Sequence, residues 1–254
     1  MGSTIVVKIG SSSLADAGGL CRAAVETLTR EIAALRRAGH QVVLVTSGAV
    51  AAGQRAMGET TSDEGRRAAA AAGQAVLMAG YVTACTELGF TAAQLLITSA
   101  DLREGTRLSG VLAKLLEAGV LPVINEDDAL AAKVMRNNDL VAARVAMLLG
   151  ASLLVLLTDA DGLHTDDPRR DPTAPVVSRV TRVTGRLLAT AGGPGQRGAG
   201  GMRAKLKAAA LAASAGVGVV IARAGAPDIL CRAVQEREAA GTFVIPRRAG
   251  GGYS

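Results

Sequence analysis

Two lysines in this sequence stand where they could meet an anion. Lys8 lies inside the apolar run of residues 5–9, and Lys205 lies near the start of a helical segment that follows a glycine-rich loop. A buried lysine is rare unless an anion lies beside it, and a phosphate group is such an anion. The alternative for Lys8 is a solvated position on an edge strand. We expect Lys8 to contact phosphate.

Three glycine-bearing segments offer backbone N–H groups to that phosphate. Gly10 follows the first apolar run, and Gly48 follows the second. The third segment, residues 189–201, holds six glycines and a proline and leads directly into the helix that carries Lys205. Glycine allows a close backbone approach, and helix N-termini attract anions. The sequence has neither the P-loop pattern nor a G-x-G-x-x-G directly after a strand, which counts against those two nucleotide sites.

Carboxylates follow two further apolar runs. Asp159 comes just after residues 153–157, and the string NEDD at residues 125–128 comes after residues 120–124. Such groups cap helices, bind magnesium, hold a lysine or solvate a turn. The carboxyl ends of parallel strands meet at one edge of a sheet, so we expect these groups and the lysines to share a site. That combination indicates phosphoryl transfer.

The thiols and imidazoles show no pattern of a metal centre. Cys21, Cys85 and Cys231 are odd in number and widely spaced, so we expect reduced thiols rather than disulfides or a zinc site. His40 and His164 are remote from each other in sequence. We therefore predict no metal centre built from these thiols or imidazoles.

Composition limits the partners of the chain. Of its 254 residues, 49% are hydrophobic and 20% are charged, which excludes extensive disorder. The formal charge is +6, but two Phe, two Tyr and no Trp provide few stacking surfaces for nucleic acid. The longest uncharged stretch, residues 68–86, is mostly alanine and only weakly apolar. We expect a cytoplasmic protein that binds neither nucleic acid nor membrane.

The order of segments predicts an α/β fold with a mostly parallel sheet covered on both faces. We predict strands at residues 5–9, 42–46, 91–97, 120–124, 153–157 and 217–221. We predict helices at residues 20–37, 66–87, 107–117, 140–149 and 202–215. Glycines that end a helix in a left-handed conformation precede five strands, at Gly39, Gly89, Gly119, Gly150 and Gly216. No linker interrupts this order, so we predict one domain over residues 1–246 and a flexible tail over residues 247–254.

Five strings of this sequence resemble, in order and spacing, those of the amino acid kinase family. They are VVKIGSS at residues 6–12, VLVTSGAVAAG at 43–53, PVINEDD at 122–128, LLTDADGL at 156–163 and GGMRAK at 200–205. The similarity extends over residues 4–246. The TSGA and INE-x-D strings resemble the branch of the family that phosphorylates the γ-carboxylate of L-glutamate, the first step of proline biosynthesis.

The resemblance implies a three-layer α/β/α sandwich and a phosphotransferase that uses ATP with Mg²⁺. By it, Lys8 and Lys205 contact the transferred phosphoryl group, and Asp159 orients the two lysines. The resemblance places ATP against Lys8, Gly10, Ser11, Thr158, Asp159, Ala199, Gly200, Gly201, Met202, Arg203, Ala204 and Lys205. It places the amino-acid substrate against Ser47, Gly48, Ala49, Asp128, Asn137 and Asn138.

The acceptor is where the sequence departs from the family. Asp128 suits an α-ammonium, and Ser47 with either Asn137 or Asn138 suits an α-carboxylate, but residues 135–142 differ from the usual family string. One alternative is a kinase for another small carboxylic or amino acid. The other is a catalytically weak, regulatory ligand-binding protein of the same fold. The resemblance further implies a homo-oligomer and, as partner, the reductase that consumes glutamyl phosphate.

Overall fold

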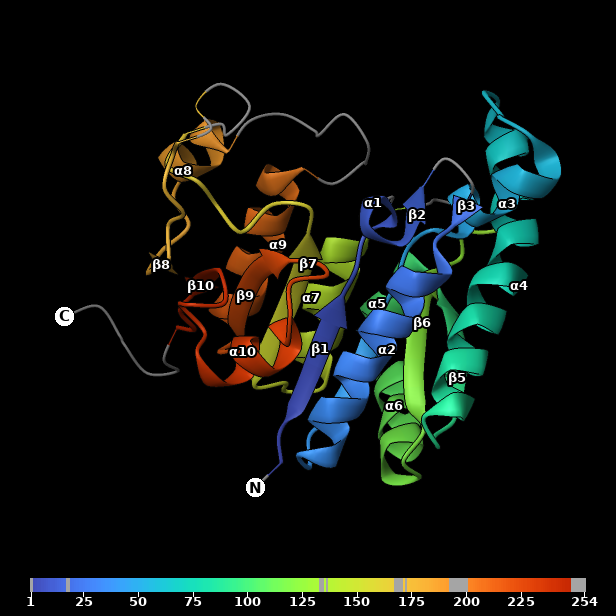
Figure 1. The fold of residues 1–254 in the computed structure, drawn as a ribbon, viewed down its shortest axis with the longest axis horizontal. Helices are drawn as coiled ribbons and strands as arrows, with labels where there is room; N and C mark the ends of the chain where they lie inside the picture. The colour runs from blue at the N-terminus through green and yellow to red at the C-terminus, as the bar shows by residue number, and fades with distance from the viewer. Residues whose placement is uncertain are drawn as a thin grey trace.

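An eight-stranded sheet forms the centre of the protein, in the order β5-β6-β4-β1-β7-β9-β10-β8, with β5 and β8 at its two edges (Figure 1). The computed structural model describes residues 2–16, 19–132, 135, 137–166, 171, 173–191 and 201–247. The strands are β1 (Thr4–Lys8), β4 (Gln41–Val45), β5 (Ala92–Ile97), β6 (Leu121–Glu126), β7 (Leu153–Thr158), β8 (Arg179–Val180), β9 (Gly218–Arg223) and β10 (Thr242–Val244). A separate two-stranded sheet joins β2 (Ala15–Asp16) to β3 (Gly19–Leu20).

Helices cover both faces of the large sheet, which confirms the predicted three-layer α/β/α arrangement. The helices are α1 (Ser11–Leu14), α2 (Arg22–Arg37), α3 (Ala49–Met57), α4 (Asp63–Glu87), α5 (Ser99–Glu104), α6 (Thr106–Glu117), α7 (Asn138–Leu148), α8 (Gly185–Thr190), α9 (Met202–Ser214) and α10 (Ile229–Gln235). One buried apolar cluster joins α2, α4 and α10 to the sheet, and a second joins α6, α7 and α9 to its other face.

The strands that surround β1 run parallel, so their carboxyl ends lie at one edge of the sheet. β1 pairs in parallel with β4 on one side and with β7 on the other. The chain passes from β1 to β4 and later continues from β7 on the opposite side, which makes this edge a topological switch point, where ligands bind in such folds. β1 and β7 point toward the end of the molecule where α1, β2 and β3 lie (Figure 1).

Six predicted strands and five predicted helices are confirmed, with small differences at their ends. The five helix-ending glycines have φ between +56° and +88°, as their position required. The sequence patterns missed the shorter elements, which carry little periodicity: α1, α3, α5, α8, α10, β2, β3, β8 and β10. β10 also pairs antiparallel with β9, which departs from the parallel arrangement of the inner strands.

Helices α3 and α4 pack with their backbones almost in contact. A Cβ added at Gly73 of α4 would lie 1.9 Å from the Ala49 carbonyl oxygen of α3, and one at Gly53 would lie 1.9 Å from the Ala69 oxygen. By length and hydropathy α4 could span a membrane, but half of its apolar 18-residue stretch is buried inside the protein. The close contact fixes the start of α3, where Gly48 and Ala49 lie, against α4.

Candidate active site

Alternation along β1 sets the direction of Lys8. Val6 packs into the cluster on the α7–α9 face, whereas the odd-numbered residues of the strand pack on the α2 face. Lys8 shares the parity of Val6 and therefore points toward α7 and α9. Those helices carry Asp139 and Lys205 close to their N-termini. Lys8 lies on a central strand, not on the solvated edge strand that was its alternative.

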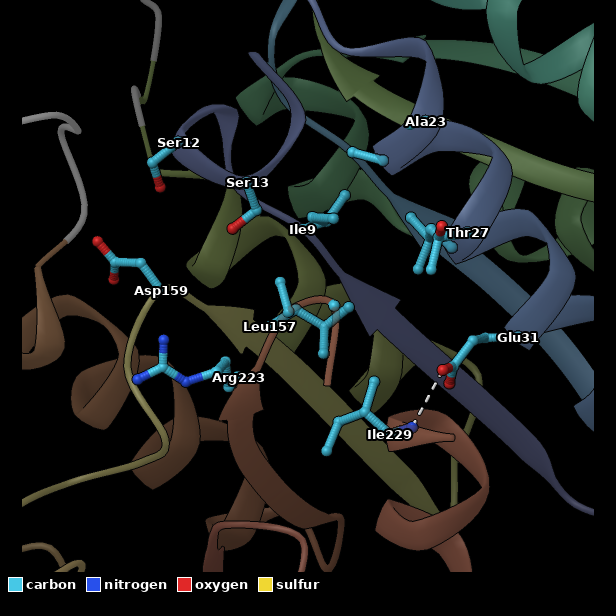
Figure 2. A pocket seen from close by; sticks show the side chains of 14 residues that line it. Ile9, Ser12, Ser13, Ala23, Thr27, Glu31, Leu157, Asp159, Arg223 and Ile229 are labelled. Carbon is cyan, nitrogen blue, oxygen red and sulfur yellow. Dashed lines mark hydrogen bonds between the residues drawn. The ribbon is translucent and has the colours of Figure 1, made fainter. Parts of the chain in front are cut away.

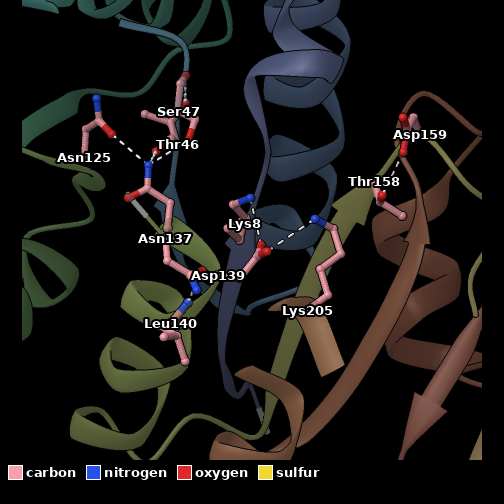
Figure 3. Close-up of polar contacts among 11 residues, drawn as sticks. Lys8, Thr46, Ser47, Asn125, Asn137, Asp139, Leu140, Thr158, Asp159 and Lys205 are labelled. Carbon is pink, nitrogen blue, oxygen red and sulfur yellow. Dashed lines mark hydrogen bonds and ion pairs between the residues drawn. The ribbon is translucent and has the colours of Figure 1, made fainter. Parts of the chain in front are cut away.

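One carboxylate contacts both lysines. Asp139 Oδ1 lies 2.7 Å from Lys8 Nζ, and Lys205 Nζ donates to Asp139 Oδ2 at 3.3 Å (Figure 3). The three residues are buried, with exposed fractions of 5% for each lysine and 1% for Asp139. Together they carry one net positive charge, which an anionic phosphoryl group would neutralise.

The surroundings of Lys8 change its pKa in opposite directions. Burial is the larger and lowers the pKa of Lys8 below its ordinary value, while the Asp139 carboxylate raises it and the Lys205 ammonium lowers it further. Asp139 thus favours the charged form of a lysine whose pKa is lowered by burial. The sequence analysis missed this residue, because an aspartate in the first turn of a helix has an ordinary local role.

The prediction that Asp159 orients the two lysines is wrong, because that carboxylate contact belongs to Asp139. Asp159 Oδ1 instead accepts from Thr158 Oγ1 at 3.1 Å. Like Leu157, two residues before it, Asp159 lines a pocket of about 460 Å³ on the α2–α10 face of the sheet (Figure 2). Alternation at the end of β7 therefore turns Asp159 away from the face on which the lysines lie.

The Asp159 pocket is lined by both apolar and polar groups. Ile9, Leu157 and Ile229 supply apolar surface, and the polar lining residues are Ser12, Ser13, Thr27, Glu31, Asp159 and Arg223. The Glu31 carboxylate of α2 accepts from the backbone N–H groups of Ile229 and Leu230, at 3.1 and 2.7 Å, and so caps α10. Burial raises the pKa of Glu31. A lining of this kind suits a small ligand with both apolar and polar parts.

Two predicted phosphate turns border the lysines. Gly10 precedes α1, and a Cβ there would lie 3.5 Å from Lys8 Nζ, so glycine leaves the space beside the ammonium open. Ser11 is the first residue of α1. Gly201 is the N-cap of α9, and Met202, Arg203 and Ala204 lead to Lys205. Ala199 and Gly200 lie outside the described residues, as do residues 248–254 of the predicted tail.

Asn138 links the ends of strands β4 and β6, near the residues predicted to bind the amino-acid substrate. Its Nδ2 lies 2.9 Å from the Thr46 carbonyl oxygen, 2.6 Å from Ser47 Oγ and 3.1 Å from Asn125 Oδ1. Asn137 instead caps α7, since its Oδ1 accepts from Leu140 N at 3.2 Å. The structure thus places Asn138 beside Ser47, whereas the sequence left the choice between the two asparagines open.

The turn after β6 places Asp128 at the same edge of the sheet. Its backbone N–H donates to the Glu126 carbonyl at 2.9 Å. Arg67 of α4 donates to the carbonyl oxygens of Ala129 and Ala131 at 3.2 and 3.0 Å, which holds the turn. The other acceptor-side turn begins at Gly48, whose φ of +108° favours glycine.

Metal ligands are not grouped in the described part of the chain. No set of three or more His, Cys, Asp and Glu side chains within the described ranges lies close enough to hold an ion. Cys21, Cys85 and Cys231 are free thiols, and burial raises the pKa of Cys85 to about 11, so that thiol is poorly reactive.

Three comparisons relate the chain to known proteins. The profile of the amino acid kinase family matches residues 3–223. Glutamate 5-kinases of Neisseria meningitidis and Neisseria gonorrhoeae are each 40% identical over 97% of the chain, which covers 69% and 86% of those proteins. Glutamate 5-kinase of Geobacillus thermodenitrificans is 44% identical over 85% of the chain and 61% of that protein. Carbamate kinase from Giardia lamblia bound to AMP-PNP shares the fold, with a TM-score of 0.67, 19% identity and coverage of 97% and 99%.

Proposed function

The chain belongs to the amino acid kinase family, and from that premise we propose that it transfers the γ-phosphoryl group of ATP to the γ-carboxylate of L-glutamate. The observation that carries this proposal is the buried Lys8–Asp139–Lys205 cluster at the carboxyl ends of the strands. It lies next to the amide group of Asn138 and the hydroxyl group of Ser47. The glutamate 5-kinase relatives support the choice of acceptor.

The two lysines supply the charge that this reaction requires. A carboxylate nucleophile is ionised at neutral pH, so the reaction needs no general base, and catalysis consists of aligning two anions and neutralising the charge between them. Lys8 reaches the phosphoryl oxygens from strand β1 and Lys205 reaches them from helix α9 on the same face of the sheet, and Asp139 holds both ammonium groups in place. When bound with ATP, Mg²⁺ would supply further positive charge to the phosphates.

We propose that the nucleotide extends from this cluster across the Gly10 turn. Thr158 and Asp159 end the neighbouring strand β7, and the first turn of α9 offers backbone N–H groups to phosphate oxygens. The Asp159 pocket is large enough for the base and ribose of a nucleotide. Its lining reaches the phosphate turn through Ser12 and Ser13.

An acceptor screen tests this function. The purified chain is assayed for ATP-dependent ADP release with glutamate, acetylglutamate, aspartate and glutarate, and hydroxylamine traps any acyl phosphate. We expect glutamate to be favoured over acetylglutamate by at least about tenfold in kcat/KM, because Asp128 would face an apolar methyl group in the acetylated acid. A preference for another acid would identify a different kinase, and no turnover would indicate a ligand-binding protein.

Lys205→Ala separates catalysis from binding in the same assay. We expect kcat to fall by more than the KM for ATP rises, because the charge contact strengthens in the transition state. Lys207→Ala is the matched control, since Lys207 is exposed on the same helix. A change confined to the KM for ATP would reduce Lys205 to a binding residue.

We also propose that the protein is a cytoplasmic homo-oligomer. The uncharged side of α4 leaves apolar residues exposed, and β5 beside it pairs with only one strand, β6. An exposed apolar face next to an open strand edge favours association with another protein surface. The acyl phosphate product is reactive, which supports the reductase that consumes it as a partner.

A further inference from the structure

Arg67 of helix α4 reaches the turn that carries Asp128, the residue expected to meet the α-ammonium of the acceptor. Arg67 Nη1 donates to the carbonyl oxygens of Ala129 and Ala131, at 3.2 and 3.0 Å. Arg67 Nε donates to Asp63 Oδ2 at 2.7 Å, one helical turn earlier on α4. The guanidinium is therefore held on one side by its own helix, and on the other it binds residues 62 and 64 positions later in the sequence.

The start of this turn is attached to the sheet without Arg67. The N–H of Asp127 donates to the Ile97 carbonyl oxygen of β5 at 2.9 Å. Asp127 Oδ1 accepts from two N–H groups later in the turn, at 3.1 and 3.0 Å, and so fixes its local shape. In the described part of the chain, residues 129–131 receive hydrogen bonds from another element only through Arg67. Asp127 thus shapes the turn, whereas Arg67 sets where its far end lies against α4.

The charge of Arg67 offers a second way for it to act on the acceptor. Residues 126–128 are Glu, Asp and Asp, and the first turn of α4 contains Asp63 and Glu64. A cation beside this acidic surface would favour any anionic acceptor by charge alone, and most of all the acid with the largest negative charge. A positional effect on Asp128 would instead favour an acid that carries an ammonium group. The two effects can therefore be separated by the choice of substrate.

We infer that Arg67 is a positioning residue for the acceptor, which acts by holding the Asp128 carboxylate where it meets the α-ammonium. Hydrogen bonds from a charged donor such as this guanidinium are stronger than those between neutral groups. Without them the far end of the turn loses its attachment to α4, and part of the binding free energy of the ammonium is used to order the turn. The inference rests on the proposed function and adds a residue of α4 to the acceptor site.

The test compares glutamate with glutarate, which has the same two carboxylates but no ammonium and therefore one more negative charge. Arg67→Met keeps most of the length of the side chain and removes its donors. We expect the preference for glutamate over glutarate in kcat/KM to fall at least about tenfold, through a higher KM for glutamate, while the KM for ATP stays unchanged. Arg66→Met, at the exposed neighbouring arginine of α4, is the matched control and should behave as wild type.

Two results would overturn the inference. One is a glutamate-to-glutarate ratio that is unchanged or higher in Arg67→Met, because loss of charge alone weakens binding of the dianion glutarate more. The other is equal use of both acids by the wild type, since no ammonium contact would then exist. A wild type that phosphorylates neither acid contradicts the proposed function instead, so the two failures are distinguishable.

A second pair of variants keeps the test decisive if Arg67→Met does not fold. Asp63→Ala, at an exposed residue, releases the guanidinium and should lower the same ratio at least about twofold. Glu64→Ala removes an equal charge from the same helical turn and should leave the ratio at its wild-type value. Equal ratios in the two variants would overturn the inference.

Discussion

At the scale of single residues, burial of Lys8 matters only because an acidic side chain lies against it. A lysine at the end of a central strand loses its hydration, and Asp139 restores part of that stabilisation at 2.7 Å. Phosphoryl oxygens bound beside Lys8 would restore the rest of the stabilisation that the ammonium loses with its hydration. The position of Lys8 therefore costs solvation energy that a bound anion offsets.

Lys8→Met should leave the fold intact and lower kcat by at least about 100-fold, the usual effect of removing one charge contact to the transition state. The change replaces a buried ammonium with an apolar chain of similar length, and Asp139 keeps Lys205 as a partner. Steady-state kinetics and thermal unfolding check it. Lys207→Met is the control, and a kcat equal to wild type would remove Lys8 from the mechanism.

The pKa of Lys8 predicts an alkaline limit to activity. Because burial lowers this pKa, the ammonium deprotonates at a lower pH than the ordinary 10.5, and kcat/KM should fall as pH rises through that lowered value. Asp139 raises the same pKa, so Asp139→Asn should move the limit to lower pH in its residual activity. An alkaline limit at the same pH in wild type and in Asp139→Asn would show that a group other than Lys8 sets this limit.

At the scale of elements, α4 holds the acceptor side of the site along one face. Arg67, Gln74 and Tyr81 recur every seven residues, which is close to two helical turns. Arg67 contacts the turn after β6, Gln74 contacts Asn125, and the Tyr81 hydroxyl lies 2.9 Å from Thr46 Oγ1. Tyr81 is fully buried, and burial raises its pKa. The helix thus fixes three segments that precede or contain substrate-binding candidates.

Gly73→Ala should lower the free energy of unfolding by about 1 to 3 kcal/mol, because the new Cβ would force α3 and α4 apart. Gly110→Ala is the matched control: Gly110 lies exposed in α6, nothing lies within 4 Å of an added Cβ, and alanine should stabilise that helix by up to about 1 kcal/mol. Thermal or urea unfolding measures both. Equal stability of the two variants would show that α3 and α4 can separate without loss.

At the scale of the whole molecule, one side of α4 carries an exposed face without charge. We define this α4 apolar face by Ala68, Ala71, Ala75, Val76, Ala79 and Val82. Val76 and Val82 are 51% and 43% exposed, and Leu96 on the neighbouring edge strand β5 is 43% exposed. Charged residues usually protect such edges from pairing, and β5 contains none.

Val76→Arg should dissociate the oligomer, raising its dissociation constant at least about 100-fold, because a guanidinium would be buried without a partner in the interface. Sedimentation velocity over a range of concentrations measures the change. Val111→Arg, at an exposed valine of α6, is the control and should leave the mass unaltered. An oligomer that survives Val76→Arg would place the interface elsewhere.

The amino-acid sequence by itself determined the layered α/β fold and drew attention to the two lysines that the structure brings together. Strand and helix periodicity, together with glycines that require a left-handed backbone, specified the order of elements, and local patterns singled out Lys8 and the glycine loop before Lys205. These features depend on residues close together in the chain, which is why the sequence reveals them.

Only the tertiary structure decided which side chains meet. Asp139 lies 66 residues before Lys205 in sequence, and the packing of α7 against α9 on one face of β1 brings both to Lys8. The same alternation turns Asp159 toward the other face. Likewise Gln74, in an alanine-rich helix, meets Asn125 only because α4 packs on the face of the sheet that carries Asn125. Contacts between distant segments depend on face and register, which no local pattern records.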